Sequence, residues 1–200
     1  MSPRRREVLD EAARLFHERG YMGTSMDDIA DAVGLTKGTL YHHFPSKAVI
    51  LGEIYEEAVS FVLAHMSELE QQGSATAAVR SIVRAIVELI GEHRYHVTVF
   101  YQEMRWIGEW LPAKDARAIR KQIREYIDSV ERVIQRGIDE GDFRPTDASV
   151  AAYALIGMAS WTYQWFEPSR RLSAEAVSEL LSQTFLEGLV VPAGRGPAKG

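Results

Sequence analysis

Apolar side chains recur at intervals of three and four residues along most of the chain, and this spacing places them on one face of an α-helix. Glycine and proline residues interrupt the pattern and mark where helices end. Between these breaks we predict about nine helices and no strand. The predicted ranges are 4–19, 26–33, 37–44, 46–72, 74–92, 95–110, 113–140, 147–166 and 173–191.

One of these segments has a mixed pattern. Residues 95–110 contain the run VTVFY, in which apolar and polar residues partly alternate as they do in a strand. No other segment shows the pattern of a partner strand, so we predict a helix here as well. The sequence therefore predicts an all-α fold.

The stretch from Thr24 to Lys47, TSMDDIADAVGLTKGTLYHHFPSK, predicts two short helices joined by a tight turn. Ser25 is placed to cap the first helix, and Asp28 completes a capping box three residues later. Gly34 can adopt the positive φ that ends this helix and turns the chain. Thr36 is placed to cap the second helix. Together these features predict a helix-turn-helix motif.

The second helix of this motif has an unusual outer surface for its length. Leu40 and Phe44 form its apolar face, so the remaining side chains point outward, and none of them is an acid. A DNA major groove receives such a helix by its N-terminal end. Lys37 suits a guanine edge, the methyl group of Thr39 suits a thymine, and Gly38 lets the backbone approach closely.

Hydroxyl, imidazole and ammonium groups beside this helix suit the phosphates that flank the bases. The predicted DNA-binding residues are Thr24, Ser25, Thr36, Lys37, Gly38, Thr39, Tyr41, His42 and Lys47. The N-terminal run Arg4 to Arg6 is either a basic arm that touches the backbone or the minor groove, or a solvated terminus.

An N-terminal helix, the 24–47 string and a long following helix resemble the TetR/AcrR family of bacterial transcriptional repressors, most clearly over residues 5–55. The resemblance implies a homodimer that binds a palindromic DNA operator through two recognition helices in successive major grooves. It also implies that the helix starting at Ser46 connects a ligand pocket to the N-terminal DNA-binding helices, the head of the protein. The last two long helices would pair with their mates through Ala151, Ala152, Leu155, Ala159, Val177, Leu180, Leu181 and Thr184.

We therefore expect three parts along the chain. Residues 1–46 form a helix-turn-helix DNA-binding domain, and residues 47–191 form a helical ligand-binding and dimerisation domain. Residues 192–200, PAGRGPAKG, form a tail whose Pro and Gly content predicts disorder.

The composition favours a cytoplasmic globular protein. Hydrophobic residues make up 46% of the chain and Cys is absent, so we expect a substantial core and no disulfide framework. The N-terminus lacks the apolar run of a signal peptide, and no segment approaches the roughly 20 apolar residues of a membrane-spanning helix.

The net charge of −5 lies wholly after residue 50, because residues 1–50 hold seven Lys and Arg and seven Asp and Glu. A neutral head can bind phosphate locally, whereas the acidic remainder discourages DNA from binding elsewhere.

Bulky aromatic side chains gather after residue 100, where all four Trp lie. Trp161 and Trp165 are four residues apart and would share one helical face with Met158. Such side chains suit the wall of a cavity for a flat or long apolar ligand, and equally an ordinary core or a dimer interface. Because the family has a pocket in this region, the predicted ligand-binding residues are Phe100, Tyr101, Met104, Trp106, Tyr126, Met158, Trp161 and Trp165.

A basic run opens the helix predicted over 113–140, and it is either a solvated face or a cationic mouth beside the pocket. Its members are Lys114, Arg117, Arg120, Lys121 and Arg124. The blocks GIDEGDFRP and WTYQWFEP resemble TetR-type regulators of fatty acid or sterol catabolism, some of which sense acyl-CoA. We expect a small apolar or amphipathic effector, such as an acyl-CoA or a related lipid or sterol metabolite. The alternatives are another aromatic or hydrophobic compound, such as a drug, and activation in place of repression.

No catalytic, cofactor or metal site is legible in the sequence. The G-x-S-x-G, P-loop and H-E-x-x-H patterns are absent. His93, His96 and Glu103 lack a second His pair or a Cys, so we expect them to be surface or polar pocket residues and not metal ligands. Two other classes stay open: a helical enzyme, for which no nucleophile and base are visible, and a dimeric adaptor whose head binds protein.

Overall fold

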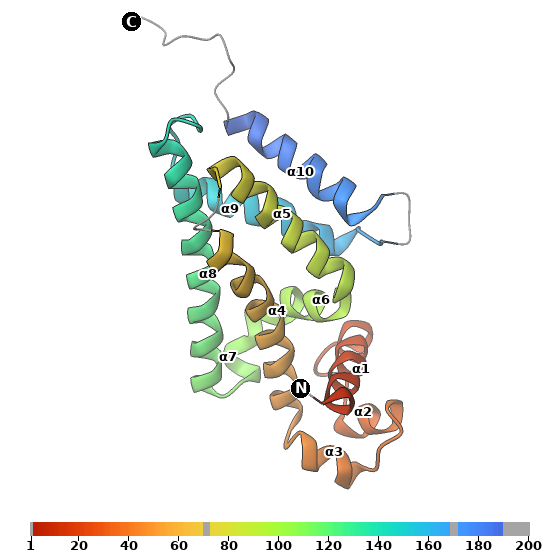
Figure 1. Cartoon of the computed structure of the whole chain (residues 1–200). Coiled ribbons are helices and arrows are strands. Elements are labelled where there is room, and N and C mark those ends of the chain that lie inside the picture. Colours follow the sequence, from red (N-terminus) through yellow and green to blue (C-terminus); the bar gives the residue numbers. More distant parts are fainter. Residues whose placement is uncertain (1, 70–72, 169–171, 190–200) are drawn as a thin grey trace, which may run out of the picture. The chain divides into compact units, whose positions relative to one another are not determined.

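The computed structural model describes residues 2–69, 73–168 and 172–189, and helices are the only regular elements within these ranges (Figure 1). The predicted all-α fold is confirmed. The elements are α1 Pro3–Arg19, α2 Met26–Ala32, α3 Lys37–His43, α4 Lys47–Leu69, α5 Ala75–Glu92, α6 Arg94–Glu103, the 3-10 helix η1 Met104–Trp106, α7 Ile107–Trp110, α8 Ala113–Asp139, α9 Ala148–Ser160, the 3-10 helix η2 Trp161–Gln164 and α10 Ala174–Leu189.

Some of the predicted helix ends and the predicted tail fall on residues that the structure does not describe. The predicted helix ends at 70–72 and 190–191 and the predicted tail at 192–200 lie outside the described residues. In the part of the chain that the structure does describe, no helix is both long and apolar enough to cross a membrane.

The segment predicted as one helix over 95–110 is broken, and that prediction is wrong. The α-helical part ends at Glu103, and η1 and α7 follow it. The tighter turns of η1 rotate the chain so that Ile107 and Leu111 enter the core, whereas Trp106 stays at the surface with 37% of its area exposed.

The helix predicted over 147–166 is also shorter than expected. It ends at Ser160, after which the buried hydroxyl of Thr162 donates to the Ala159 carbonyl at 2.7 Å. A local bond of this kind competes with the regular helical ladder and favours a tight turn. Trp161 and Trp165 therefore do not share a helical face, and they are 61% and 49% exposed.

By packing, the chain separates into two compact units. Unit 1 comprises Met1–Phe61 and His93–Ile123, and unit 2 comprises Val62–Glu92 and Arg124–Gly200. Helices α4 and α8 each contribute residues to both units. The predicted functional boundary after residue 46 does not coincide with this division, because α6, α7 and the start of α8 pack with the N-terminal helices.

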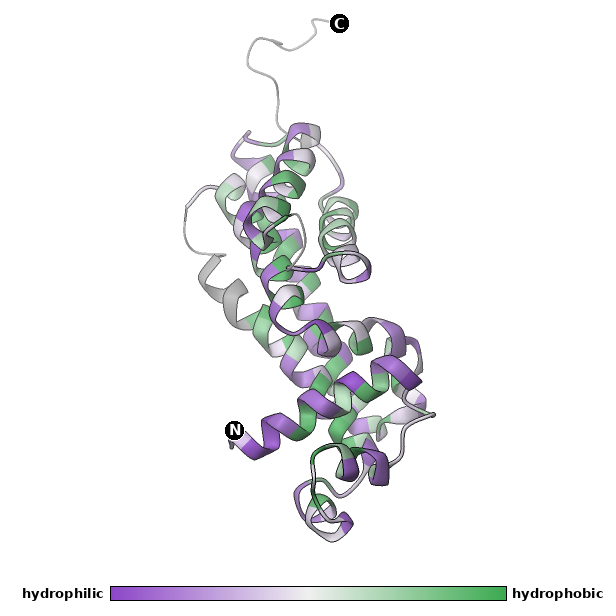
Figure 2. Ribbon diagram, turned by 90° about the vertical axis from the view of Figure 1, so that its right-hand side faces the viewer, coloured by the Kyte–Doolittle hydropathy of each residue, from purple (hydrophilic) through white to green (hydrophobic). Residues whose placement is uncertain are grey.

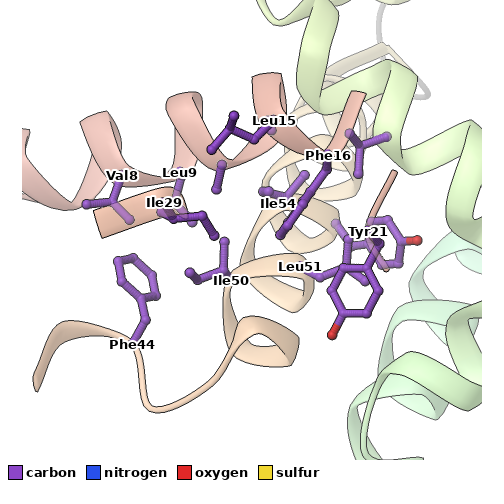
Figure 3. Close-up of a cluster of buried hydrophobic side chains, with 14 of the residues drawn as sticks. Val8, Leu9, Leu15, Phe16, Tyr21, Ile29, Phe44, Ile50, Leu51 and Ile54 are labelled. Atoms are coloured by element: carbon purple, nitrogen blue, oxygen red, sulfur yellow. The ribbon is translucent and has the colours of Figure 1, made fainter. Parts of the chain in front are cut away.

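Unit 1 is built on one buried cluster that joins α1, α2, α3 and the first part of α4 (Figure 3). Hydrophobic and hydrophilic residues alternate around these helices, so each turns an apolar side inward (Figure 2). Burying a large apolar side chain contributes about 1.5–3 kcal/mol. The cluster includes Val8, Leu9, Leu15, Phe16, Tyr21, Ile29, Leu40, Phe44, Ile50, Leu51 and Ile54, and it continues through Val99, Ile107 and Leu111.

Unit 2 is organised around α5, which contacts α9 and α10. Ten residues of α5 are buried, among them Ile82, Val83 and Val87. Close packing continues at Gly137 of α8, where a Cβ atom would lie 2.3 Å from the ring of Phe143. Only glycine therefore fits at this position without displacing the Phe143 ring.

Most of the residues predicted to meet the partner subunit face the interior of unit 2, and the prediction is wrong for the buried ones. Ala151, Ala152, Leu155, Ala159 and Val177 are all less than a tenth exposed within the chain, and Leu181 is half-buried. Helix α9 has the sequence ASVAAYALIGMAS, which is apolar nearly all round, so periodicity does not reveal which side faces inward. The apolar side chains left exposed are Val150, Tyr153 and Trp161, with Leu180 of α10.

Candidate nucleic-acid interface

The helix-turn-helix is fixed by bonds between residues close in sequence. The capping box is complete, because the Ser25 hydroxyl accepts from the Asp28 N–H at 3.1 Å and the Asp28 carboxylate accepts from the Ser25 N–H at 2.8 Å. The Ser25 hydroxyl also donates to the Asp28 carboxylate at 2.5 Å, and this bond, followed by the one from the Ser25 N–H, lowers the pKa of Asp28. Gly34 has a φ of +62°, and the Thr36 hydroxyl accepts from the Thr39 N–H at 3.2 Å. The predicted caps and turn are confirmed.

Helix α3 exposes the side predicted to face DNA. Leu40 and Phe44 are fully buried, whereas the other side is open to solvent at Thr36, Lys37, Gly38, Thr39, Tyr41 and His42. The Lys37 ammonium donates to Asp27 at 2.9 Å, and this bond raises the pKa of Lys37. Both side chains are more than half exposed, and an ion pair in water is weak enough to be exchanged for a stronger anion.

Arg5 fixes the C-terminal end of α3. Its guanidinium lies over the Phe44 ring with 4.1 Å to the centroid, donates to the His43 carbonyl at 2.8 Å and donates to Glu53 of α4 at 2.9 Å. Arg4 donates to the Val33 carbonyl at 2.7 Å. These arginines lie within α1, which Ser2 caps, so the alternative of a frayed basic arm is wrong.

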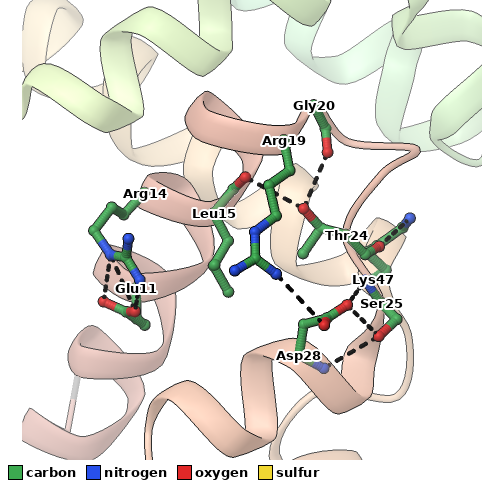
Figure 4. Close-up of polar contacts among 9 residues, drawn as sticks. All are labelled: Glu11, Arg14, Leu15, Arg19, Gly20, Thr24, Ser25, Asp28 and Lys47. Carbon is green, nitrogen blue, oxygen red and sulfur yellow. Dashed lines mark hydrogen bonds and ion pairs between the residues drawn. The ribbon is translucent and has the colours of Figure 1, made fainter.

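Thr24 does not reach the surface as its predicted role requires. The residue is 2% exposed, and its hydroxyl donates to the Gly20 carbonyl at 3.0 Å (Figure 4). The side chain therefore shapes the turn between α1 and α2, and it is removed from the set of predicted side-chain contacts.

Lys47 is also turned inward. Its ammonium donates to the carbonyls of Tyr21 and Thr24 at 2.6 and 2.7 Å and lies 4.3 Å from the centre of the Tyr21 ring. Burial lowers the pKa of Lys47. In this conformation the ammonium is bonded to main-chain carbonyls of the α1–α2 turn.

An open groove of about 450 Å³ runs beside the exposed side of α3. Its walls come from the α1–α2 turn, the start of α2 and α3. The lining residues are Met22, Gly23, Thr24, Ser25, Met26, Asp27, Asp28, Lys37, Tyr41 and Lys47. Of the predicted DNA-binding residues whose side chains are not turned inward, the groove brings together Ser25, Lys37 and Tyr41.

A buried histidine escaped the sequence analysis, which expected His96 at a surface or pocket wall. His96 of α6 is 3% exposed, with Nε2 3.0 Å from a carboxylate oxygen of Asp10 in α1 and Nδ1 3.3 Å from Glu57 in α4. Three residues this far apart in sequence carry no shared pattern. Among the described residues, no group of three His, Cys, Asp or Glu side chains could hold a metal ion.

The predicted ligand-binding residues of unit 1 lie on and beside α6. Phe100 is half-buried and packs edge to face on Tyr55 of α4 with 5.6 Å between ring centres. Met104 is half-buried, whereas Tyr101 and Trp106 are each 37% exposed. The hydroxyl of Tyr55 is fully buried and has no hydrogen-bond partner among the described residues. Such a group is a candidate polar contact for a ligand.

The predicted ligand-binding residues of unit 2 differ from one another in exposure. Tyr126 and Met158 are half-buried, whereas Trp161 and Trp165 lie at the surface. The two tryptophans therefore do not form a buried wall in this chain.

Two family models match the chain. Residues 8–54 match the model described as "Bacterial regulatory proteins, tetR family", and residues 72–189 match "Tetracyclin repressor-like, C-terminal domain". Over 195 residues the chain is 31% identical to the HTH-type transcriptional repressor KstR2 of Mycolicibacterium smegmatis, a match that covers 96% of this chain and 93% of that protein.

Solved structures resemble the chain along almost its whole length. The ketosteroid transcriptional regulator KstR2 of Mycobacterium tuberculosis matches with a TM-score of 0.88 and 25% identity over 96% of this chain and 97% of that one. AibR in complex with isovaleryl coenzyme A and operator DNA matches with a TM-score of 0.78 and 28% identity over 94% and 98%.

The environment of His96 predicts a pH dependence of stability. Burial lowers the pKa of His96 despite the nearby carboxylates of Asp10 and Glu57, while Arg6 and His93 act in the same direction as burial. The unfolded chain then binds this proton at a higher pH than the folded one does. The free energy of unfolding should therefore fall as the pH drops below about 6.5.

We expect His96→Gln to lose less stability than wild type between pH 7 and pH 5.5, measured by urea denaturation, with His42→Gln as the exposed control. Burial raises the pKa of Glu57, which contributes with the opposite sign, so the comparison is between proteins over one pH range. Equal slopes for wild type and His96→Gln would contradict the assignment.

Proposed function

Because the chain belongs to the TetR family of bacterial regulatory proteins, we propose that it binds a palindromic operator as a homodimer and leaves the DNA when a small effector binds. It is a DNA-binding transcriptional repressor of the helix-turn-helix type. The observation that carries the proposal is the exposed side of α3, which is held on unit 1 by two buried anchors and bears no acid.

The surface of α3 is suited to reading bases and binding phosphates. Lys37 and Thr39 lie in its first turn, the part of a recognition helix that meets base edges. Lys37 exchanges its exposed partner Asp27 for a guanine, and the Thr39 methyl contacts a thymine. Tyr41 and His42, further along, reach the flanking phosphates and fix the register.

The dimer forms through the apolar side of α9 and α10 that the single chain leaves open. Val150, Tyr153 and Trp161 are 65%, 59% and 61% exposed and recur along α9 and into η2, and Leu180 of α10 is 56% exposed. An exposed apolar patch of this kind marks an association surface. A two-fold axis applied to it gives a self-complementary interface, and a palindromic operator requires the two copies of α3 in such a dimer to meet one duplex.

The effector acts by linkage between two sites. Suppose that a ligand binds best to a dimer whose two α3 helices are not spaced to fit the operator. Such a ligand lowers the affinity of the dimer for DNA, and DNA lowers the affinity for the ligand by the same factor. A coupling of roughly 1–3 kcal/mol changes affinity by about 5–150-fold.

We infer that the effector is amphipathic, with an apolar body and an anionic group, as an acyl-CoA has. Half-buried Phe100 and Met104 supply apolar surface, and Tyr55 supplies one hydroxyl. AibR, which shares the fold, carries isovaleryl coenzyme A in its complex. The relatives named KstR2 include a ketosteroid regulator, which favours a bulky apolar body.

The charge distribution of α8 supports an anionic group. The first twelve residues of this helix, 113–124, carry five exposed cations and one acid, although the helix dipole disfavours cations at that end. The arrangement therefore does not stabilise the helix, and it suits a bound anion. The cations are Lys114, Arg117, Arg120, Lys121 and Arg124.

Variants of α3 should separate base reading from phosphate binding. Operators are first selected from a random duplex pool with the wild-type protein, and binding is then measured by fluorescence anisotropy. We expect Tyr41→Ala to weaken every selected duplex to a similar degree and Lys37→Ala to relax the preference at one base position by about tenfold. Arg84→Ala, which removes an exposed cation of α5, is the control. Unchanged affinity and preference in both α3 variants would refute the interface.

A charge placed in the open apolar patch should split the dimer. We expect Leu180→Glu to run as a monomer in analytical ultracentrifugation at micromolar concentration, because association would bury an unpaired carboxylate. Gln135→Glu introduces the same charge on an exposed polar side of α8 and should stay dimeric. A dimeric Leu180→Glu protein would place the interface elsewhere.

The effector class can be tested with acyl-CoAs of increasing chain length, using free coenzyme A and the free acids as controls. We expect calorimetric binding that grows with the apolar body, and release of the operator at matching concentrations. Phe100→Ala should weaken binding of the longest compound most. If none binds and none releases DNA, the acyl-CoA class is excluded while the DNA-binding role stands.

A further inference from the structure

We propose that Lys47 and Glu103 act together as a clamp on the α1–α2 turn, Tyr21–Thr24, and that this clamp positions the DNA-reading surface without touching DNA. The proposal rests on the proposed function, because its consequence is measured as operator affinity. It assigns both residues as positioning residues, whereas the sequence analysis expected Lys47 to bind phosphate.

Lys47 holds the carbonyl side of the turn. Its ammonium donates to the Thr24 carbonyl at 2.7 Å (Figure 4). It also donates to the Tyr21 carbonyl at 2.6 Å and lies over the Tyr21 ring. A lysine that served only a phosphate would keep its ammonium in water until DNA arrived. Here the ammonium is partly buried, and the two carbonyls and the aromatic ring compensate for the water that it has lost.

Glu103 holds the other side of the same residue, at the Tyr21 N–H group. One carboxylate oxygen accepts from the Tyr21 N–H at 3.3 Å, and the other accepts from the indole N–H of Trp110 at 3.2 Å. The Tyr21 ring lies 5.3 Å from the Phe16 ring and 5.3 Å from the Trp110 ring. Main chain and side chain of Tyr21 are thus held by α1, α4, α6 and α7.

The turn depends on these contacts because little else anchors it. Met22 is 70% exposed, and Gly23 follows it. Beyond Tyr21, the turn is tied to unit 1 by the buried Thr24 and by Gly23, which packs close to the Arg19 carbonyl of α1. Ser25, the cap of α2, comes next, so a shift of the turn moves the start of α2 and the wall of the groove that contains Lys37 and Tyr41.

The clamp also gives a route by which an effector is sensed. Glu103 is the last residue of α6, and η1 begins at the adjoining Met104 and includes Trp106, two of the predicted ligand-binding residues. A ligand that repositions Met104 displaces the Glu103 carboxylate from the Tyr21 N–H. All of these contacts lie within unit 1, so the route requires no movement of unit 2.

The test uses operator duplexes selected by the full-length wild-type protein. We expect Glu103→Ala to bind them roughly tenfold more weakly, the equivalent of one strong hydrogen bond to a charged group. Electrostatics alone predicts the opposite sign, because removing an acid from a DNA-binding protein strengthens binding. Glu109→Ala, which removes an exposed acid of α7, is the matched control and should bind at least as tightly as wild type.

Lys47→Met separates positioning from phosphate contact. It should weaken binding while leaving the slope of log affinity against log salt unchanged, whereas loss of one phosphate contact lowers that slope by about 0.9. Because both residues act through Tyr21, the double variant should lose less affinity than the sum of the single losses. Tyr41→Ala should add its full effect to Glu103→Ala.

The outcomes distinguish the clamp from the function on which it rests. If the wild type selects no duplex, the proposed function fails. If it does and Glu103→Ala binds as well or better, or if Lys47→Met lowers the salt slope by about one unit, the clamp is overturned. Thermal melting curves identify a variant that does not fold. Lys47 and Glu103 lie on different helices, so if one variant does not fold, the variant of the other residue tests the clamp.

Discussion

The function of this protein depends on the burial of two side chains, Leu40 and Phe44, beneath a helix of only seven residues. A helix this short is not stable in water on its own, because too few hydrogen bonds compensate for its nucleation. Its orientation is therefore set by its packing against α2 and by the core of unit 1. Arg5 reinforces this packing, since it covers the Phe44 ring and ties the His43 carbonyl to Glu53. The exposed residues of α3, which we propose to meet DNA, are positioned by a core in which they take no part.

Features encoded over a few residues could be predicted from the sequence. The capping box at Ser25, the positive φ of Gly34 and the cap at Thr36 each depend on neighbours within three positions, and the structure confirms them. The all-α class followed from the period of apolar residues in the same way. Local chemistry decides such features, so the rest of the chain does not alter them.

The remaining features depend on distant parts of the chain. Helix α9 is apolar nearly all round, so its sequence does not indicate that Ala152 faces inward and Tyr153 outward. Lys47 directly follows the helix-turn-helix, where a lysine is expected to bind a phosphate. It turns inward because the Tyr21 and Thr24 carbonyls lie close to it in the fold. The pairing of His96 with Asp10 and Glu57 joins three helices and leaves no periodic trace.

The composition of unit 1 bears on how such regulators can be recombined. The segment 93–123 returns to pack with the N-terminal helices, and Val99, Ile107 and Leu111 share their core. A chimera joined after residue 46 would transplant the reading motif but leave behind side chains that cover α1 and the Tyr21 turn. A chimera of two relatives therefore preserves DNA recognition only when α6 and α7 are transferred together with the N-terminal helices. Otherwise the new ligand-binding domain must supply equivalent side chains to cover α1.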